Sequence, residues 1–389
     1  EKGAPFYRFY YGNVAKVEKV GERGVKFTFK PGENRELPLI LGQITVLPKH
    51  WWEKRDFTKS TLEPPLGSGP YKVKEFEANR DVVYERVKDY WAANHPTKRG
   101  EYNFDILRYE YYRDGTVSLE AFKAGNYDFR SENSSKNWAT AYDVPALKDG
   151  DLIKREIKHN RSSGMQGFVF NLRRPLFQDP RVRRALNFAF DFEWSNKTLF
   201  YDQYARTNSY FENSELASTA LPEGEELKLL EKYRDKLPKE VFETAYTNPV
   251  SDGSGNIRSN LRVANKMLRD AGWRVDKKTR ILTHTKTGQP FEFEVMLVQP
   301  TFERVVLPFT KNLSRLGIKV NVRTVDSAQY QKRIDDFDFD MVVSSWGQSQ
   351  SPGNEQRDFW GSTAADRPGS RNAAGIKDPV IDELIEVLI

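Results

Sequence analysis

The side chains with catalytic or metal-binding chemistry are few and widely spaced along the chain. The absence of cysteine excludes thiol nucleophiles, iron–sulfur clusters and disulfides. No Gly-x-Ser-x-Gly elbow offers a serine nucleophile. No histidine has a second histidine or a carboxylate at a metal-ligand spacing such as His-Glu-x-x-His; the four are His50, His95, His159 and His284. These patterns predict no metal, no cofactor and no enzymatic activity.

Two groups of neighbouring carboxylates are the remaining catalytic candidates. They are Asp335 with Asp336, and Glu223 with Glu225 and Glu226. Each group lies in a polar stretch, where a solvated face explains it. A hydrolase that uses a carboxylate pair stays open as an alternative, but no spacing supports it. The glycine-containing segments 67–70 and 252–255 lack the spacing of phosphate-binding loops and indicate turns.

Charge and aromatic content favour a binding protein. The chain has 61 Lys and Arg against 55 Asp and Glu, a net charge of +6 that is spread widely. The arginines at 173–174 and 181–184 are dispersed around a predicted helix, whereas nucleic-acid-binding proteins concentrate positive charge on one face. Aromatic residues make up 13% of the chain, which indicates a large, partly hydrated ligand cavity. We therefore expect non-covalent binding of a ligand and no nucleic-acid partner.

Strands dominate the expected structure of the first part of the chain. A length of 389 residues predicts two or three domains, and no run reaches the roughly 18 apolar residues of a membrane helix. Alternating apolar and polar residues predict a hairpin near residues 17–30. The proline- and glycine-rich segment 64–71 predicts a domain crossing near Pro64. Further predicted strands are 71–76, 81–87, 104–112 and 127–129, with a helix at 114–124.

Helices and strands alternate in the rest of the chain. A strand is predicted at 166–172 and a helix at 180–190, with Asp179 as its N-cap. Residues 208–257 predict mostly loop, with one helix near 225–237. Beyond them, predicted helices at 260–270, 301–316 and 327–335 alternate with strands at 291–298, 318–325 and 339–344. This alternation predicts an α/β fold with a parallel or mixed sheet.

Several of these segments resemble one family, in order along the chain. The matching segments are 67–73 with 84–91, 171–186, 264–273, 316–320 and 339–346, and they include a Gly-Ser-Gly-Pro-Tyr turn, an Asp-Pro-Arg-Val-Arg helix start and an Ala-Gly-Trp helix end. Together they are similar to the family 5 extracellular solute-binding proteins, the oligopeptide and dipeptide receptors of ABC importers. The opening residues 6–14 resemble the YejA-type branch of that family, which is linked to peptide and peptide-antibiotic uptake.

The resemblance implies an α/β fold of the type II (class C) periplasmic binding proteins. That fold has two lobes and three parts, and the lobes close on the ligand about a hinge. On this basis we expect a truncated small-lobe subdomain at residues 1–65, a first-lobe segment at 66–173 and a second-lobe domain at 174–389 that returns toward the first lobe near its end. The family's usual opening segment and closing helices are absent, so we expect that terminal segments are missing.

The resemblance also implies a function and a compartment. It predicts a monomeric receptor in the periplasm, secreted with a removed signal peptide, that delivers peptides to the permease of an ABC importer in the inner membrane. Because fold does not fix ligand, a sugar, an opine or a nickel complex stays open as the ligand of the same fold.

The resemblance places the most informative site residues after the last predicted strand. The oligopeptide receptors of the family carry a tryptophan there and, three residues later, an aspartate that pairs with the amino terminus of the peptide. Trp346 matches the first position, and Ser349 occupies the second. A neutral hydroxyl cannot supply the charge-assisted bond that an ammonium group prefers. We therefore hypothesise that the amino end of the ligand is blocked or is bound elsewhere.

Each candidate also has a structural explanation. We expect Trp346 to pack against the ligand, although a tryptophan at the end of a strand also fits a core position. Arg333 is a weaker candidate: it lies near the position of the family's carboxylate-binding arginine, but it also fits the surface of a helix. Glutamine amides suit the groups of a peptide backbone, although loop glutamines are usually solvated. These remaining candidates are Gln348, Gln350, Asn208, Tyr210, Ser370 and Asn372.

Overall fold

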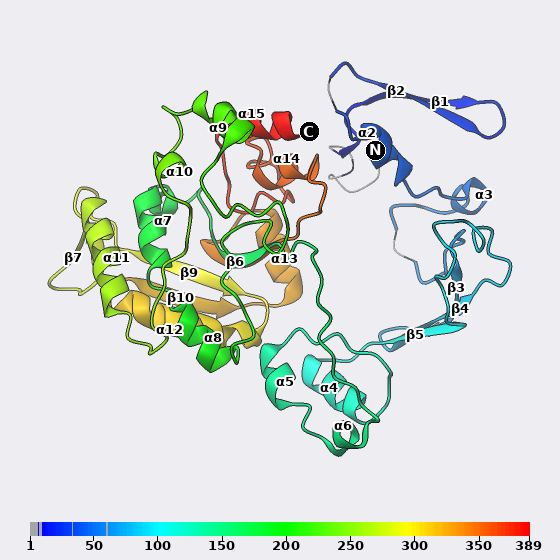
Figure 1. Ribbon diagram of the computed structural model, residues 1–389, viewed down its shortest axis with the longest axis horizontal. Helices are drawn as coiled ribbons and strands as arrows, with labels where there is room; N and C mark the ends of the chain where they lie inside the picture. The colour runs from blue at the N-terminus through cyan, green and yellow to red at the C-terminus, as the bar shows by residue number, and fades with distance from the viewer. Residues whose placement is uncertain (1–6, 8–9, 33, 60) are drawn as a thin grey trace. The chain divides into compact units, whose positions relative to one another are not determined.

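The computed structural model describes the chain except residues 1–6, 8–9, 33 and 60 (Figure 1). The chain separates into two compact units, the first mainly residues 38–155 and the second mainly residues 10–37 and 156–389. The predicted boundary after residue 65 lies inside the first unit, and the one after residue 173 lies inside the second. The three-part division therefore stays a prediction. Residues 6, 8 and 9 of the opening 6–14 motif lie outside the described residues.

The first unit contains a three-stranded antiparallel sheet in the order β3-β4-β5. Its strands, β3 (Tyr71–Glu77), β4 (Asp81–Arg86) and β5 (Ile106–Glu110), confirm three predicted strands. The helices are α2 (Leu37–Gly42), α3 (Lys49–Trp52), α4 (Gly115–Lys123), α5 (Ser135–Thr140) and α6 (Pro145–Asp149). The predicted helix at 114–124 is confirmed as α4, where the carboxylate of Asp114 accepts hydrogen bonds from two backbone amides of the first turn.

The predicted strand at residues 127–129 is wrong, because this segment folds back onto α4. The ring of Tyr127 packs against Phe122 at a centroid distance of 5.2 Å. Its hydroxyl donates to the carbonyl oxygen of Ser118 at 2.9 Å. The segment is thus held by side-chain contacts to the preceding helix and pairs with no described strand.

Tyr142 makes the stability of the first unit sensitive to alkaline pH. Burial, followed by the hydrogen bond that its hydroxyl donates to Glu132 Oε2 at 2.7 Å, raises its pKa to about 12. Because the folded pKa lies above the ordinary value of 10.0, the stabilisation is complete below pH 10 and is lost as the pH rises through 12. We expect Tyr142→Phe to flatten the fall in unfolding free energy across this range, measured by urea denaturation. An equally steep fall in the variant would contradict this origin.

The second unit is built on a four-stranded mixed sheet in the order β10-β9-β11-β6 (Figure 1). β10 (Lys319–Thr324) and β11 (Met341–Trp346) run parallel to β9 (Glu292–Leu297), and β6 (Met165–Phe170) runs antiparallel to β11. This topology confirms the predicted alternation of strands and helices and its mixed sheet. A hairpin of β1 (Val14–Val20) and β2 (Gly24–Phe29) confirms another predicted pair.

The helices of the second unit confirm the strongest periodic predictions and add others. The predicted helices correspond to α7 (Pro180–Asn187), α9 (Gly224–Glu231), α11 (Arg258–Asp270), α12 (Glu303–Ser314) and α13 (Ser327–Asp335). Asp179 caps α7 as expected. Elements without a prediction are α8 (Phe192–Leu199), α10 (Glu240–Glu243), α14 (Glu355–Trp360), α15 (Pro379–Leu388), and the short pair β7 (Trp273–Val275) and β8 (Leu282–His284).

The sheet separates two hydrophobic cores, because successive side chains of a strand point to opposite faces. Phe293 and Met341 point to the face covered by α7, α11 and α12, where the larger core contains Phe177 and Leu186. The core on the other face is smaller and consists of Val169, Met296, Val325, Phe339, Val342, Trp346, Phe359 and Ala373. Trp346, the last residue of β11, therefore belongs to the smaller core.

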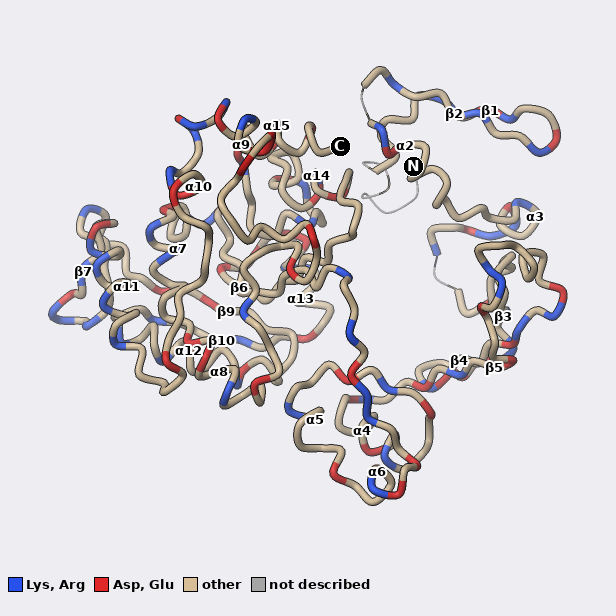
Figure 2. Tube along the Cα trace, in the orientation of Figure 1, with Lys and Arg blue, Asp and Glu red and all other residues tan. Residues whose placement is uncertain are grey.

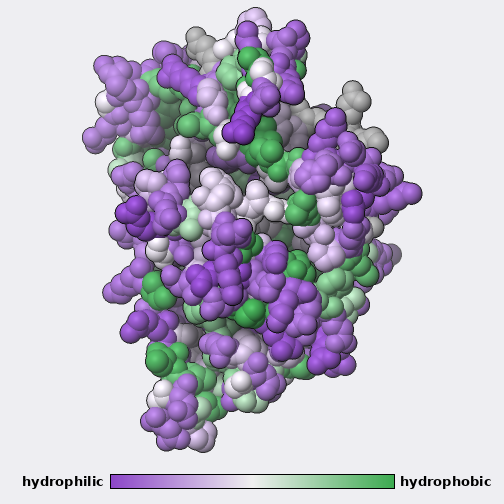
Figure 3. Space-filling view, turned by 90° about the vertical axis from the view of Figure 1, so that its right-hand side faces the viewer, coloured by the Kyte–Doolittle hydropathy of each residue, from purple (hydrophilic) through white to green (hydrophobic). Residues whose placement is uncertain are grey.

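Charged and apolar surface groups are interspersed. Figure 2 shows basic and acidic residues mixed along the chain. Two arginines of α7 form ion pairs within the protein. Arg181 pairs with Asp179 at 2.7 Å and Arg184 with Glu240 at 3.1 Å. On the face drawn in Figure 3, apolar residues form small, separate patches among polar ones. Among the described residues, no helix combines the length and the apolar character needed to cross a membrane.

Candidate functional site

Three aromatic side chains from distant parts of the second unit meet at the end of β11. We call Tyr210, Trp346 and Trp360 the aromatic cluster. The ring of Tyr210 stands edge-on to Trp346 at a centroid distance of 5.7 Å and to Trp360 at 4.6 Å, and the two indoles lie 5.3 Å apart. Trp346 is only 6% exposed, whereas Tyr210 is 38% exposed. Burial raises the pKa of Tyr210 above its ordinary value of 10.0.

A glycine fixes the backbone beside this cluster. Gly164 has a φ of 62°, and a Cβ placed there would lie 2.2 Å from the carbonyl oxygen of Trp346. Only glycine allows this approach of the two chain segments. The position of Trp346 is therefore set by the backbone before β6 as well as by the ring contacts.

Two glutamine amides lie next to the aromatic cluster. The indole nitrogen of Trp360 donates to Gln356 Oε1 at 2.9 Å, and Gln356 Nε2 donates to Gln348 Oε1 at 2.7 Å. Both glutamines are buried. Gln348 Nε2 is buried as well and has no hydrogen-bond partner among the described residues. The site therefore contains an amide donor that the described part of the protein leaves unused.

The two other loop candidates, Ser349 and Gln350, are exposed and lie beside Gln348. The hydroxyl of Ser349 donates to the carbonyl oxygen of Ser351 at 2.7 Å. Gln350 Nε2 donates to the carbonyl oxygen of Asn160 at 3.3 Å. The position that would carry an aspartate in oligopeptide receptors is thus neutral, and its hydroxyl closes a local turn.

Arg333 and Asn208 both make bonds within the protein. Its Nη1 lies 2.9 Å from Glu294 Oε1 in an ion pair, and its Nε donates to the carbonyl oxygen of Asp338 at 2.9 Å. Asn208 also bonds internally, since its Oδ1 accepts from the backbone amide of Asn248 at 3.0 Å. Both side chains are thus occupied by bonds within the protein, and their ligand-binding role stays a prediction.

Ser370 and Asn372 organise the loop that follows α14. The hydroxyl of Ser370 donates to the carbonyl oxygen of Ala364 at 2.6 Å. Asn372 is fully buried; its Nδ2 donates to the carbonyl oxygens of Gly361 and Ile376, and its Oδ1 accepts from two backbone amides. Because these bonds use the amide fully, Asn372 keeps no free group for a ligand, and a binding role for this pair stays a prediction.

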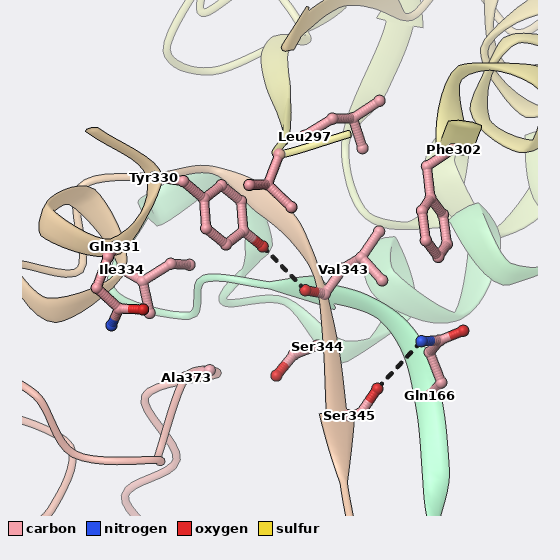
Figure 4. Close-up of a pocket in the computed structure, with 11 residues that line it drawn as sticks. Gln166, Leu297, Phe302, Tyr330, Gln331, Ile334, Val343, Ser344, Ser345 and Ala373 are labelled. Carbon is pink, nitrogen blue, oxygen red and sulfur yellow. Dashed lines mark hydrogen bonds between the residues drawn. The ribbon is translucent and has the colours of Figure 1, made fainter. Parts of the chain in front are cut away.

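A cavity of about 270 Å³ opens near the carboxyl ends of β9 and β11 (Figure 4). Tyr330 closes one side of it and donates to the carbonyl oxygen of Val343 at 3.1 Å, and Gln166 Nε2 donates to Ser345 Oγ at 3.2 Å. The other lining residues are Leu297, Val298, Phe302, Gln331, Ile334, Ser344 and Ala373. None carries a charge. Carboxyl ends of parallel strands are favoured ligand sites in α/β proteins, and this lining suits an uncharged, mostly apolar group.

Sequence reasoning did not identify several of these residues. Trp360 and Gln356 lie one helical turn apart on α14, an unpredicted helix, so their shared face was not recognised. The cavity residues Gln166, Tyr330 and Ser345 come from two strands and a helix that were predicted, but only the sheet order brings them together. Among the described residues, no group of three histidine, aspartate or glutamate side chains is arranged to hold a metal ion.

The comparison with protein families identifies the class of this protein. The model of the bacterial extracellular solute-binding proteins, family 5 (middle region), matches residues 1–367. The chain belongs to this family, and the predicted α/β fold of two-lobed periplasmic binding proteins is confirmed.

Individual relatives refine this assignment. Over 99% of the chain, it is 49% identical to the uncharacterized protein y4wM of Sinorhizobium fredii and 46% identical to the probable peptide-binding protein YejA of Agrobacterium fabrum. It spans 59% and 64% of the length of these two relatives. The oligopeptide-binding protein AppA of Bacillus subtilis, solved with a nonapeptide, has the same fold, with a TM-score of 0.69, 22% identity, and coverage of 98% of this chain and 67% of AppA.

Proposed function

We propose that this protein is a receptor that captures peptides and delivers them to the permease of an ABC importer. The observation that carries the proposal is the site at the end of β11, where the aromatic cluster lies beside an unused amide donor. A peptide backbone offers neutral carbonyl and amide groups that such a site can bond, and its apolar side chains suit an uncharged cavity. The cavity beside Ser345 adds space for one such side chain.

Two relatives support a peptide ligand. The Agrobacterium relative is named a probable peptide-binding protein, and the B. subtilis structure contains a nonapeptide. The family is described as extracellular, which supports our assignment of the protein to the periplasm. A Thermotoga maritima protein with the same fold is named a periplasmic oligopeptide-binding protein of an ABC transporter, which supports a transporter partner.

We further propose that the site accepts peptides whose amino end carries no charge. Ser349 offers only a hydroxyl where an aspartate would pair with an ammonium group, and that hydroxyl already donates to Ser351. Two carboxylates of the neighbouring segments accept from backbone amides: Glu355 Oε1 from that of Gly353 at 3.1 Å, and Glu36 Oε2 from that of Asn354 at 2.9 Å. A blocked amino end avoids burying an ammonium group beside the hydroxyl of Ser349, which carries no counter-charge.

A lysine-free tetrapeptide library, made in free-amine and N-acetylated forms, tests both parts of this proposal. The purified protein is dialysed against each form, and the retained peptides are counted by mass spectrometry. We expect intact peptides to be retained, and the acetylated form at least as strongly as the free form. Because lysine is absent, acetylation changes only the amino terminus, so each free peptide is the control for its acetylated partner.

The possible outcomes separate the alternatives. Strong preference for the free-amine form would contradict the blocked amino end while leaving peptide capture in place. Cleaved peptides would indicate a hydrolase. Retention of neither form would contradict peptide capture and would favour a different ligand bound by the same fold. NikZ of Campylobacter jejuni is an example, because its structure contains Ni(L-His). It shares 19% identity with this chain, with a TM-score of 0.66 and coverage of 96% of this chain and 65% of NikZ.

A further inference from the structure

The direction of the hydrogen bonds beside the aromatic cluster is fixed by one residue. An indole N–H donates and never accepts. Trp360 therefore requires the oxygen of Gln356 to face it, which leaves the Gln356 amide nitrogen to donate onward to Gln348. Gln348 must accept with its oxygen, so its own nitrogen points away from this chain of bonds. We call the sequence Trp360, Gln356, Gln348 the donor relay.

The donor relay ends on a group that lacks an acceptor. Gln348 is 9% exposed, and its Nε2 has no partner among the described residues. A buried amide donor without an acceptor destabilises a protein, so native structures rarely retain one without a reason. Gln356, in contrast, has a second acceptor, because its Nε2 also donates to Glu355 Oε1 at 3.1 Å. The bond to Gln348 is therefore not needed to satisfy Gln356.

The segment that carries Gln348 is lightly held. Residues 347–353 form no helix or strand. A single exposed bond from Gln350 to Asn160, at 3.3 Å, ties the middle of this segment to the chain before β6. Because the Gln348 nitrogen is buried, a ligand can bond to it only if this segment moves.

We propose that Gln348 Nε2 donates to a neutral oxygen of the ligand, a carbonyl of the peptide or of an acyl group on its amino end. This inference rests on the proposed peptide-binding function and specifies how the same site selects its ligand. A carbonyl oxygen accepts the bond, whereas an ammonium group has only donors and would meet another donor. Gln348 is in this way a specificity-determining residue, and the donor relay fixes the direction of its bond.

Gln348→Met tests the inference, with Gln178→Met as a matched control at an exposed glutamine. Methionine keeps the approximate volume and removes the donor, while Gln356 retains its bond to Glu355. We expect the Gln348 variant to retain at least about tenfold less of the N-acetylated tetrapeptide library than the unchanged protein, and to melt at the same or a higher temperature. The Gln178 variant is expected to match the unchanged protein in both measurements.

The two readouts distinguish this inference from the proposed function. Equal retention by the Gln348 variant and the unchanged protein would overturn the inference. A melting temperature several degrees lower in the Gln348 variant would also overturn it, because the amide would then be a structural group. Failure of the unchanged protein to retain any peptide would instead overturn peptide capture, and the melting temperature would still decide whether the Gln348 amide is structural.

Discussion

Trp346→Ala is expected to lower the free energy of unfolding by about 3–5 kcal/mol and to abolish retention of the peptide library. The side chain is 6% exposed, belongs to the smaller core, and contacts both other rings of the aromatic cluster. Its removal creates a cavity under the site and removes the packing that positions Tyr210 and Trp360, against which we place the ligand. Urea denaturation measures the first effect, and equilibrium dialysis of the folded variant below its transition measures the second.

Two further variants separate packing from binding at Trp346. Trp346→Phe keeps an aromatic ring and is expected to recover most of the lost stability. Trp91→Ala is the matched control, because Trp91 is 76% exposed and its indole donates only to the carbonyl oxygen of Ser68 at 3.0 Å. We expect a change of at most about 1 kcal/mol there. A similarly small loss for Trp346→Ala would show that the aromatic cluster does not stabilise the second unit.

Asp358→Asn is expected to destabilise the protein by about 3 kcal/mol, because it removes the charge from a buried ion-pair group. Asp358 is 2% exposed and lies on α14, the helix that carries Gln356 and Trp360. Its carboxylate accepts from Arg367 and, at 2.9 Å, from Arg371. Loss of these bonds should also loosen α14, so we expect weaker peptide retention together with a lower unfolding free energy from urea denaturation.

Asp366→Asn provides the control for the same exchange at the surface. Asp366 pairs with Lys377 at 2.7 Å, and both side chains are more than half exposed. Exposed ion pairs contribute about 0–1 kcal/mol, so a small effect is expected. Equal losses of unfolding free energy in Asp358→Asn and Asp366→Asn would mean that burial does not strengthen the ion pairs of Asp358.

The sheet and its helices were predictable because their side chains repeat with the period of each element. β9, β10 and β11 with α12 and α13 follow this rule, as do β3 and β4. Residues 127–129 satisfy the same strand pattern, yet Tyr127 packs against α4 and finds no strand to pair with. The pair β7 and β8 has only three residues in each strand, too few for a period to show. α14 is similarly short, at six residues.

The site was predictable only where a residue sits at the end of a predicted element. Trp346 ends β11, and the family resemblance points to the loop that follows it with Gln348. Trp360 and Gln356 meet them through tertiary contacts of α14, which no local pattern records. The partners of Arg333 and Asn372 were also not predictable, because Glu294 is distant in the sequence and the carbonyl oxygen of Gly361 belongs to a loop. The sequence shows which side chains can donate or accept hydrogen bonds, but only the fold determines which of these donors and acceptors lack a partner.

Native mass spectrometry of the purified protein, followed by denaturing extraction and sequencing of the bound material, tests the central claim most directly. A peptide receptor isolated from cells is expected to carry a ladder of intact peptides, and a neutral site at Ser349 and Gln348 predicts that their amino ends are blocked. Recovery of one non-peptide compound, or of peptide fragments with free amino ends produced by cleavage during incubation, would contradict the account.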